Sequence, residues 1–200
     1  MSVSPQAGPI VDDAWRAAWY SPEHGEYFAS FLRRHSRRGV RAQCLQFNEG
    51  KLLAELARRV RITTMADIGC GAGLYYPLLR ALWPNAAYRG FDISPSALQA
   101  AAGLYPEGAF LQLHEPLSRT PEACADLVFS RDVLHHQADP FAWLSELYAV
   151  TGRCLMLRIR TRETGRTVYD PERSCQYTYG RWVPFIVVQT GEFLERLQAL

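Results

Sequence analysis

The sequence is nearly without lysine: Lys51 is the only one, so almost all of its positive charge is arginine. The formal net charge is only +2, because 22 basic residues are balanced by 20 acidic ones. Domains that bind nucleic acids usually carry a stronger basic excess. The one dense basic run, 33–41, has no interleaved aromatic side chains, and such runs are usually solvated helix faces. This pattern disfavours nucleic acid as a partner.

Paired cysteines are also missing. The five cysteines are widely spaced, with no Cys-x-x-Cys motif: Cys44, Cys70, Cys124, Cys154 and Cys175. An odd number of scattered cysteines is typical of a reduced intracellular protein rather than of a disulfide framework or a zinc site. We therefore expect no bound metal.

Long hydrophobic runs are absent too. No stretch approaches the roughly 20 apolar residues that a membrane-spanning helix needs. The first eight residues lack the charged and apolar regions of a signal peptide and read as a flexible lead-in. We expect a cytoplasmic protein without a membrane partner.

What is present is an ordinary globular composition. The chain has 200 residues, of which 48% are hydrophobic and 21% charged. That length suits a single domain with a sizeable core. We expect an N-terminal helical segment, 1–60, with helices beginning near Asp12 and Ser21, packed on a core at 61–200.

The most informative stretch is a glycine-rich turn. A short apolar run at 64–68 leads into Gly69, Gly71 and Gly73, and an apolar-periodic segment follows, with its helix beginning close to Pro77. This predicts a strand, a tight turn and a helix, in which glycine lets a ligand approach the main chain. The dinucleotide fingerprint Gly-x-Gly-x-x-Gly needs a third glycine at position 74, where the chain has Leu74.

A carboxylate follows on the next predicted strand. The run 87–93 reads as a strand that carries Asp92 at its end, nineteen residues after Gly73. A carboxylate placed there accepts hydrogen bonds from both ribose hydroxyls of a nucleoside. Ile93 would lie against the adenine face, or in the core.

Two further predicted strands end in polar residues. The first, 110–113, is followed by His114 and Glu115; the second opens the block 125–136, which carries Ser130 and ends in His135 and His136. Asp139-Pro140 then starts a helix, and a fifth strand spans 154–160. A strand–helix alternation of this kind predicts a parallel α/β sheet.

The two blocks resemble motifs of class I S-adenosylmethionine-dependent methyltransferases. Asp67 and the three glycines are similar to the first motif, and Val133-Leu134-His135-His136 followed by Asp139-Pro140 is similar to the fourth. The resemblance implies a Rossmann-like, doubly wound, mostly parallel sheet with helices on both faces. It also implies transfer of a methyl group from S-adenosylmethionine to N, O or C of a small-molecule acceptor, leaving S-adenosylhomocysteine.

The resemblance and the strand ends together give a set of candidate site residues. The cofactor-binding candidates are Asp67, Gly69, Cys70, Gly71, Gly73, Asp92, Ile93, His114, Glu115 and Ser130. Either His135 or His136 would serve as general base, although the pair would equally suit a structural turn.

Substrate contacts are expected from two aromatic segments. The polar stretch 161–183 has no helical period and reads as a long irregular loop, which is usually functional. Its candidates are Tyr169, Tyr177, Tyr179 and Trp182. In the N-terminal segment Trp15, Trp19, Tyr20 and Tyr27 would form a lid over the cofactor, with Tyr20 touching substrate, or would only pack the helices.

The C-terminal part departs from the family pattern. A helix capped by Thr190 ends the sequence, where the family normally adds two antiparallel strands. Either the chain is cut short or its fifth strand is an exposed edge that a homodimer or another partner covers. Other readings stay open: a non-catalytic protein of this fold, an RNA or protein methyltransferase, and, less favoured, a dinucleotide oxidoreductase.

Overall fold

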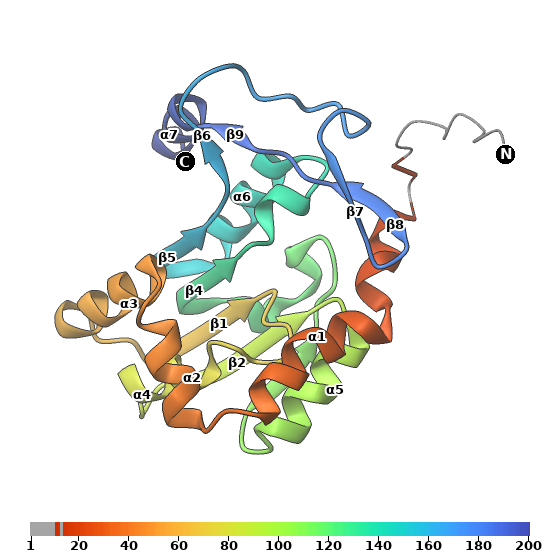
Figure 1. Ribbon diagram of the computed structural model, residues 1–200. Helices are drawn as coiled ribbons and strands as arrows, with labels where there is room; N and C mark the ends of the chain where they lie inside the picture. Colours follow the sequence, from red (N-terminus) through yellow and green to blue (C-terminus); the bar gives the residue numbers. More distant parts are fainter. Residues whose placement is uncertain (1–10, 13) are drawn as a thin grey trace, which may run out of the picture.

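A computed structural model describes residues 11, 12 and 14–200. Its centre is a parallel sheet of five strands in the order β3-β2-β1-β4-β5 (Figure 1). The strands are β1 (Thr64–Ile68), β2 (Ala87–Asp92), β3 (Ala109–Gln112), β4 (Ala125–Arg131) and β5 (Thr151–Arg158). The predicted doubly wound α/β fold is confirmed. The lead-in at 1–8 lies outside the described residues, as does Asp13.

The central strands β1, β2 and β4 are mostly buried, and their side chains alternate between the two faces of the sheet. Met65 of β1 and Leu127 of β4 belong to one core cluster, which includes α1–α4. Ala66 of β1 and Val128 of β4 point the other way, into a cluster with α6. The helices are α1 (Pro22–Arg33), α2 (Arg37–Cys44), α3 (Asn48–Arg59), α4 (Tyr76–Leu82), α5 (Pro95–Leu104), α6 (Pro140–Ala149) and α7 (Thr190–Gln198).

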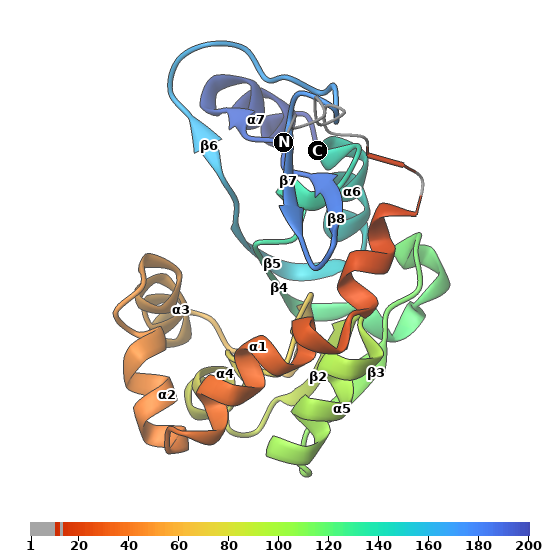
Figure 2. The ribbon, with the colours of Figure 1, turned by 45° about the vertical axis from the view of Figure 1, so that its right-hand side comes forward.

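Serine caps mark the starts of the N-terminal helices α1 and α2. Ser21 accepts a hydrogen bond from Glu23 N, and Pro22 starts α1, so this boundary is as predicted. The basic run forms α2, capped by Ser36. Glycine at position 25 lets α1 pack closely on α5. A Cβ there would lie only 2.6 Å from the carbonyl carbon of Ser96. Figure 2 shows α1 running past the end of the sheet.

Three element predictions were wrong in detail. The helix predicted to begin near Asp12 begins at Trp15 and is a 3₁₀ helix, η1 (Trp15–Tyr20). β5 begins at Thr151, three residues before the predicted start. The cap of α7 is the Gln189 side chain, which accepts from Glu192 N at 2.7 Å, not Thr190.

The prediction of an irregular loop at 161–183 was also wrong. This stretch contributes β6 (Thr161–Arg162), which pairs with β9 (Val188–Gln189), and β7 (Cys175–Thr178), which pairs with β8 (Arg181–Pro184) in an antiparallel hairpin. Tyr179 and Gly180 form its two-residue turn with φ of 47° and 78°. Such a turn normally contains asparagine or aspartate, so tyrosine conceals it in the sequence.

The hairpin is fastened to the N-terminal segment. Val183 of β8 is fully buried against Trp15 and Ala18 of η1. The two segments are far apart in the sequence but lie side by side in space (Figure 2). Together they flank the carboxyl ends of β1 and β4.

The main sheet ends at β5 in the described part of the chain. β5 pairs with β4 on one side, and no described strand pairs with its other side. This agrees with the edge predicted at the fifth strand. No helix among residues 11, 12 and 14–200 combines the length and apolarity needed to cross a membrane.

Candidate active site

The glycine turn is held open by hydrogen bonds to β2. Gly69 N and Cys70 N both donate to Phe91 O, at 2.7 and 3.0 Å. Gly71 N donates to Asp92 Oδ2 at 2.8 Å. Gly71 has φ of 53°, and a Cβ added to it would meet nothing within 4 Å. The main chain at Gly71 therefore borders free space, which a side chain would fill.

That space is a cavity of about 290 Å³ at the carboxyl ends of β1 and β4. The chain runs from β1 to β2 and β3 on one side and from β4 to β5 on the other, so the cavity lies at the switch point of the sheet, where ligands of such folds bind. Eight of the residues predicted for the site line it: Asp67, Gly69, Cys70, Gly71, Asp92, Ile93, Glu115 and His136.

Four predicted residues lie elsewhere. Gly73 packs against the Tyr105 ring, and His114 lines a separate surface cavity together with Tyr20. Ser130 is buried, and its Oγ makes no hydrogen bond with the described residues. His135 is buried, with its ring beside that of His136. Roles in binding stay predictions for all of these residues.

Two buried carboxylates line the cavity. Asp67 accepts a hydrogen bond from the Tyr88 hydroxyl at 2.9 Å, and burial raises the pKa of Asp67 to about 7. Asp92 accepts from Gly71 N and Ser94 N, each at 2.8 Å. Burial raises the pKa of Asp92, while nearby His24 and the backbone N–H donors oppose the rise. Both carboxylates have oxygen lone pairs left for a ligand.

His24 was missed by the sequence analysis, although it lines the same cavity. Its Nδ1 is buried without a hydrogen-bond partner among the described residues. Burial lowers the pKa of His24, so the ring is neutral near pH 7. No motif marks this residue, because only the packing of α1 over α5 brings it to the end of β2.

The two adjacent histidines have different surroundings. His136 Nδ1 lies 2.9 Å from Pro184 O, and a carbonyl only accepts, so Nδ1 carries the hydrogen and Nε2 keeps the lone pair in the neutral ring. Burial lowers the pKa of His136. Burial lowers the pKa of His135 further, to about 2, and its ring packs on Phe185. His136 alone lines the cavity, as expected for adjacent side chains that point apart.

An aromatic cluster closes the cavity. The Trp19 ring centroid lies 5.2 Å from His24, 4.8 Å from His136 and 5.8 Å from Tyr179. These four rings come from η1, α1, η4 (Leu134–His136) and the hairpin turn. Trp15 and Tyr27 also line the cavity, whereas Tyr20 is exposed and lies outside it. The cluster thus covers the cavity from both the N-terminal and the C-terminal parts of the chain.

Of the aromatic residues predicted to touch substrate in 161–183, only Tyr179 reaches this cavity. Tyr169 donates its hydroxyl hydrogen to Glu192. Tyr177 and Trp182 pack on each other in the hairpin, with centroids 5.5 Å apart, and Tyr177 is exposed. Their proposed substrate contacts find no support in this geometry.

A charged pair at the end of β4 was also missed. Arg131 donates from Nε to Glu49 Oε1 at 2.8 Å and lies 3.0 Å from Asp132 Oδ2 through Nη1. Asp132 also pairs with Arg158 and has φ of 61°. Both Arg131 and Asp132 line the cavity. Both residues could have been predicted, because polar residues at the carboxyl end of a central strand often line the binding site.

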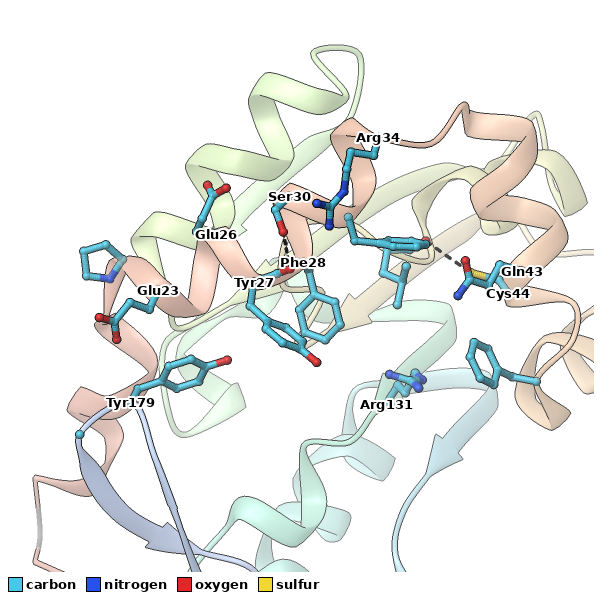
Figure 3. Close-up of a pocket in the computed structure, with 15 residues that line it drawn as sticks. Glu23, Glu26, Tyr27, Phe28, Ser30, Arg34, Gln43, Cys44, Arg131 and Tyr179 are labelled. Atoms are coloured by element: carbon cyan, nitrogen blue, oxygen red, sulfur yellow. Dashed lines mark hydrogen bonds between the residues drawn. The ribbon is translucent and has the colours of Figure 1, made fainter.

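A second, larger cavity adjoins the first (Figure 3). It has about 1190 Å³ and lies between α1, the hairpin tip and the α2–α3 turn. It shares five lining residues with the smaller cavity: Tyr27, Phe28, Leu74, Arg131 and Tyr179. Figure 3 shows Tyr27 and Phe28 projecting from α1 toward Arg131, with Tyr179 entering from the hairpin. We call this larger space the groove.

Comparison with known proteins finds similarity to methyltransferases. Residues 66–152 match the methyltransferase domain model Methyltransf_12. The chain is 36% identical over 126 residues to trans-aconitate 2-methyltransferase from Methylobacterium nodulans, an alignment that covers 59% of this chain and 48% of that protein. It is 30% identical over 104 residues to malonyl-[acyl-carrier protein] O-methyltransferase from Hahella chejuensis, covering 51% and 37%. The alignments span less than half the length of these curated relatives.

Solved structures agree on the fold. The plantazolicin methyltransferase BpumL in complex with SAH superposes with a TM-score of 0.60 at 17% identity, covering 93% of this chain and 73% of that one. Human N-acetylserotonin methyltransferase in complex with SAM gives 0.59 at 16% identity, covering 95% and 53%. Residues 66–152 therefore resemble a methyltransferase domain, and the chain has the fold of these SAM- and SAH-bound methyltransferases.

Proposed function

We propose that this protein binds S-adenosylmethionine in the smaller cavity and transfers its methyl group to a small molecule in the groove. The observation that supports this most is the exposed main chain of Gly71, held by Asp92 at the switch point of the sheet. The geometry leaves room for a nucleoside there and puts a carboxylate beside it.

The residues present fit the cofactor. Asp92 would accept hydrogen bonds from ribose hydroxyls on lone pairs that Gly71 N and Ser94 N leave free. Asp67 would face the cationic ammonium of the methionine part, which favours the ionised carboxylate. Ile93, at the end of β2, would lie against the adenine ring. Both solved structures named above contain SAH or SAM, which supports the same cofactor here.

His136 is the better placed of the two candidate bases. When bound, S-adenosylmethionine supplies a methyl group that its sulfonium already activates, so the protein has to align the acceptor, exclude water and take up a proton. Pro184 O fixes the His136 tautomer with Nε2 as the acceptor, and the lowered pKa keeps this nitrogen free near pH 7. The aromatic cluster around Trp19 excludes water.

A small-molecule acceptor is favoured over a macromolecule. The named relatives act on trans-aconitate and on a malonyl group carried by acyl carrier protein. The groove is lined by side chains of the chain itself, and its described lining residues form no basic stripe. A non-catalytic role with a partner at the β5 edge is the alternative, and it predicts weak or absent cofactor binding.

The test is cofactor affinity and turnover in the Asp92→Ala variant. We expect wild type to bind S-adenosylhomocysteine and Asp92→Ala to bind it at least about tenfold more weakly, since a hydrogen bond to a charged group contributes about 1.5–3 kcal/mol. Arg58→Ala, at the exposed end of α3, is the control and should bind like wild type. Equal affinity in wild type and Asp92→Ala would contradict the site assignment.

A further inference from the structure

Aromatic side chains make up a third of the residues that line the groove. Five aromatic side chains line it: Tyr27, Phe28, Phe31, Phe47 and Tyr179. Tyr27 is 65% exposed and Phe47 38% exposed, so both side chains are accessible to a ligand, and the Arg131 guanidinium lies 5.6 Å from the Phe47 ring centroid. Aromatic rings gain energy from stacking on other flat rings, beyond the area that they bury.

The charged groups on the walls balance each other. Glu23 and Glu26 are matched by Arg34 and Arg131, two acids against two bases. Glu26 already pairs with Arg33, and Arg131 with Glu49. A groove with no excess charge, whose central cation is already paired, gives a charged acceptor little advantage over a neutral one.

The groove is also large and continuous with the cofactor cavity. Ligand sites are typically about 300–1,000 Å³, and the groove has about 1190 Å³. An acceptor of several rings therefore fits. The part of it that reaches the shared boundary at Tyr179 and Arg131 enters the cavity that holds His136.

We infer that the acceptor is a flat, uncharged aromatic molecule that carries a hydroxyl group, with its rings between Tyr27 and Phe47 and its hydroxyl toward His136. This rests on the proposed function. In the step, the oxygen forms a bond to the methyl carbon while the carbon–sulfur bond breaks and its electron pair stays on sulfur. The hydroxyl proton passes to Nε2 of His136 and then to water. An ionised carboxylate acceptor has no proton to lose, so His136 would not be needed as a general base.

Two probe molecules with the same ring system distinguish a hydroxyl acceptor from a carboxylate acceptor. 2-Naphthol carries an uncharged hydroxyl at pH 7.5, and 2-naphthoate carries a carboxylate. Binding of each is measured by fluorescence in the presence of saturating S-adenosylhomocysteine, and methylation is followed by mass spectrometry with S-adenosylmethionine. We expect 2-naphthol to bind at least about fivefold more tightly than 2-naphthoate and to yield 2-methoxynaphthalene.

Phe47→Ala tests the placement, because Phe47 lines the groove and not the cofactor cavity. It should weaken 2-naphthol binding at least about fivefold, as expected for a lost aromatic partner, and leave S-adenosylhomocysteine affinity within about twofold. Phe47→Tyr should restore 2-naphthol binding. Tyr177→Ala removes an exposed aromatic outside both cavities and is the matched control.

The outcomes separate the inference from the function. If the protein binds S-adenosylhomocysteine but prefers 2-naphthoate, or if Phe47→Ala binds 2-naphthol like wild type, the inference is overturned and the proposed function stands. If S-adenosylhomocysteine does not bind at all, the proposed function fails and the inference falls with it.

Discussion

Gly71 carries the clearest prediction at the scale of single residues. In Gly71→Val the new side chain enters the cofactor cavity, and φ of 53° strains any residue with a Cβ. We expect S-adenosylhomocysteine affinity to fall at least about tenfold, measured by calorimetric titration. Gly103→Val is the control: Gly103 lies in α5 with open space around it, and valine and glycine have similar helix propensities. Normal affinity in Gly71→Val would show that no ligand approaches this turn.

His136 tests the chemistry. His136→Asn keeps a donor for Pro184 O but removes the basic nitrogen, so S-adenosylhomocysteine should bind as in wild type. With an acceptor that has a proton to lose, kcat should drop about 100-fold or more, the usual contribution of a general base. His135→Asn, its neighbour, should lower stability rather than kcat, because His135 does not line the cavity. An unchanged kcat in His136→Asn would assign the proton to another group.

Asp67 gives the protein a pH-dependent stability. Its pKa is about 7 in the folded state, against about 4 in the unfolded chain, so between these values the folded state holds a proton that the unfolded state has already released. Its contribution is therefore fully present below about pH 4 and is lost as the pH rises through 7. Relative to Asp67→Asn, the free energy of unfolding of wild type should fall by up to about 1.4 kcal/mol per pH unit in this window.

Urea unfolding of both proteins at pH 5, 6 and 7 measures this difference. In Asp67→Asn the amide oxygen would still accept from the Tyr88 hydroxyl, so the comparison isolates the ionisation. Parallel pH profiles for the two proteins would mean that Asp67 keeps an ordinary pKa.

Some site residues could be predicted from the sequence and others could not. The glycine turn and Asp92 were predictable, because a strand, a turn and a strand-end carboxylate are fixed by local pattern and sheet topology. His24 and Phe28 were not, because no local motif in α1 says that they border a cavity. That choice depends on the packing of α1 on α5, which a single sequence does not reveal.

At the scale of elements, the β7–β8 hairpin is a C-terminal element that lines the cofactor cavity. Val183 anchors the hairpin on Trp15 and Ala18, and the hairpin turn places Tyr179 beside Trp19. Val183→Ala should reduce the free energy of unfolding by about 1–3 kcal/mol, since it leaves a gap in a fully buried contact.

The same change should loosen the β7–β8 hairpin, which covers the cofactor cavity. Hydrogen exchange of amides in 175–184 should become faster in Val183→Ala, while the amides of β1 and β4 keep their protection. Thr178→Ala, in the same hairpin, is the control for a change that leaves the buried contact intact. Uniformly faster exchange would show that the hairpin and the sheet open together.

The hairpin was missed from sequence for a physical reason. Its strands are only four residues long, and Tyr179-Gly180 lacks the asparagine or aspartate that signals such turns. By contrast, β1, β2 and β4 were predicted because buried parallel strands read as apolar runs. The 3₁₀ type of η1 was not predicted, because the apolar spacing over one turn also fits an α-helix.

At the scale of the whole molecule, two adjoining cavities lie over one switch point. The smaller is lined by the glycine turn and two buried carboxylates, and the larger by aromatic side chains from α1 and the hairpin. The order of strands and the three core clusters hold these walls in place. A partner or second copy at the β5 edge stays a prediction.

The most direct test is calorimetric titration of the protein with S-adenosylmethionine, S-adenosylhomocysteine and NAD in parallel. We expect micromolar binding of the first two, none of NAD, and loss of both in Gly71→Val. Binding of NAD alone would make the glycine turn a dinucleotide site. If none of the three ligands binds, methyl transfer is contradicted, and the protein has this fold but acts without the cofactor.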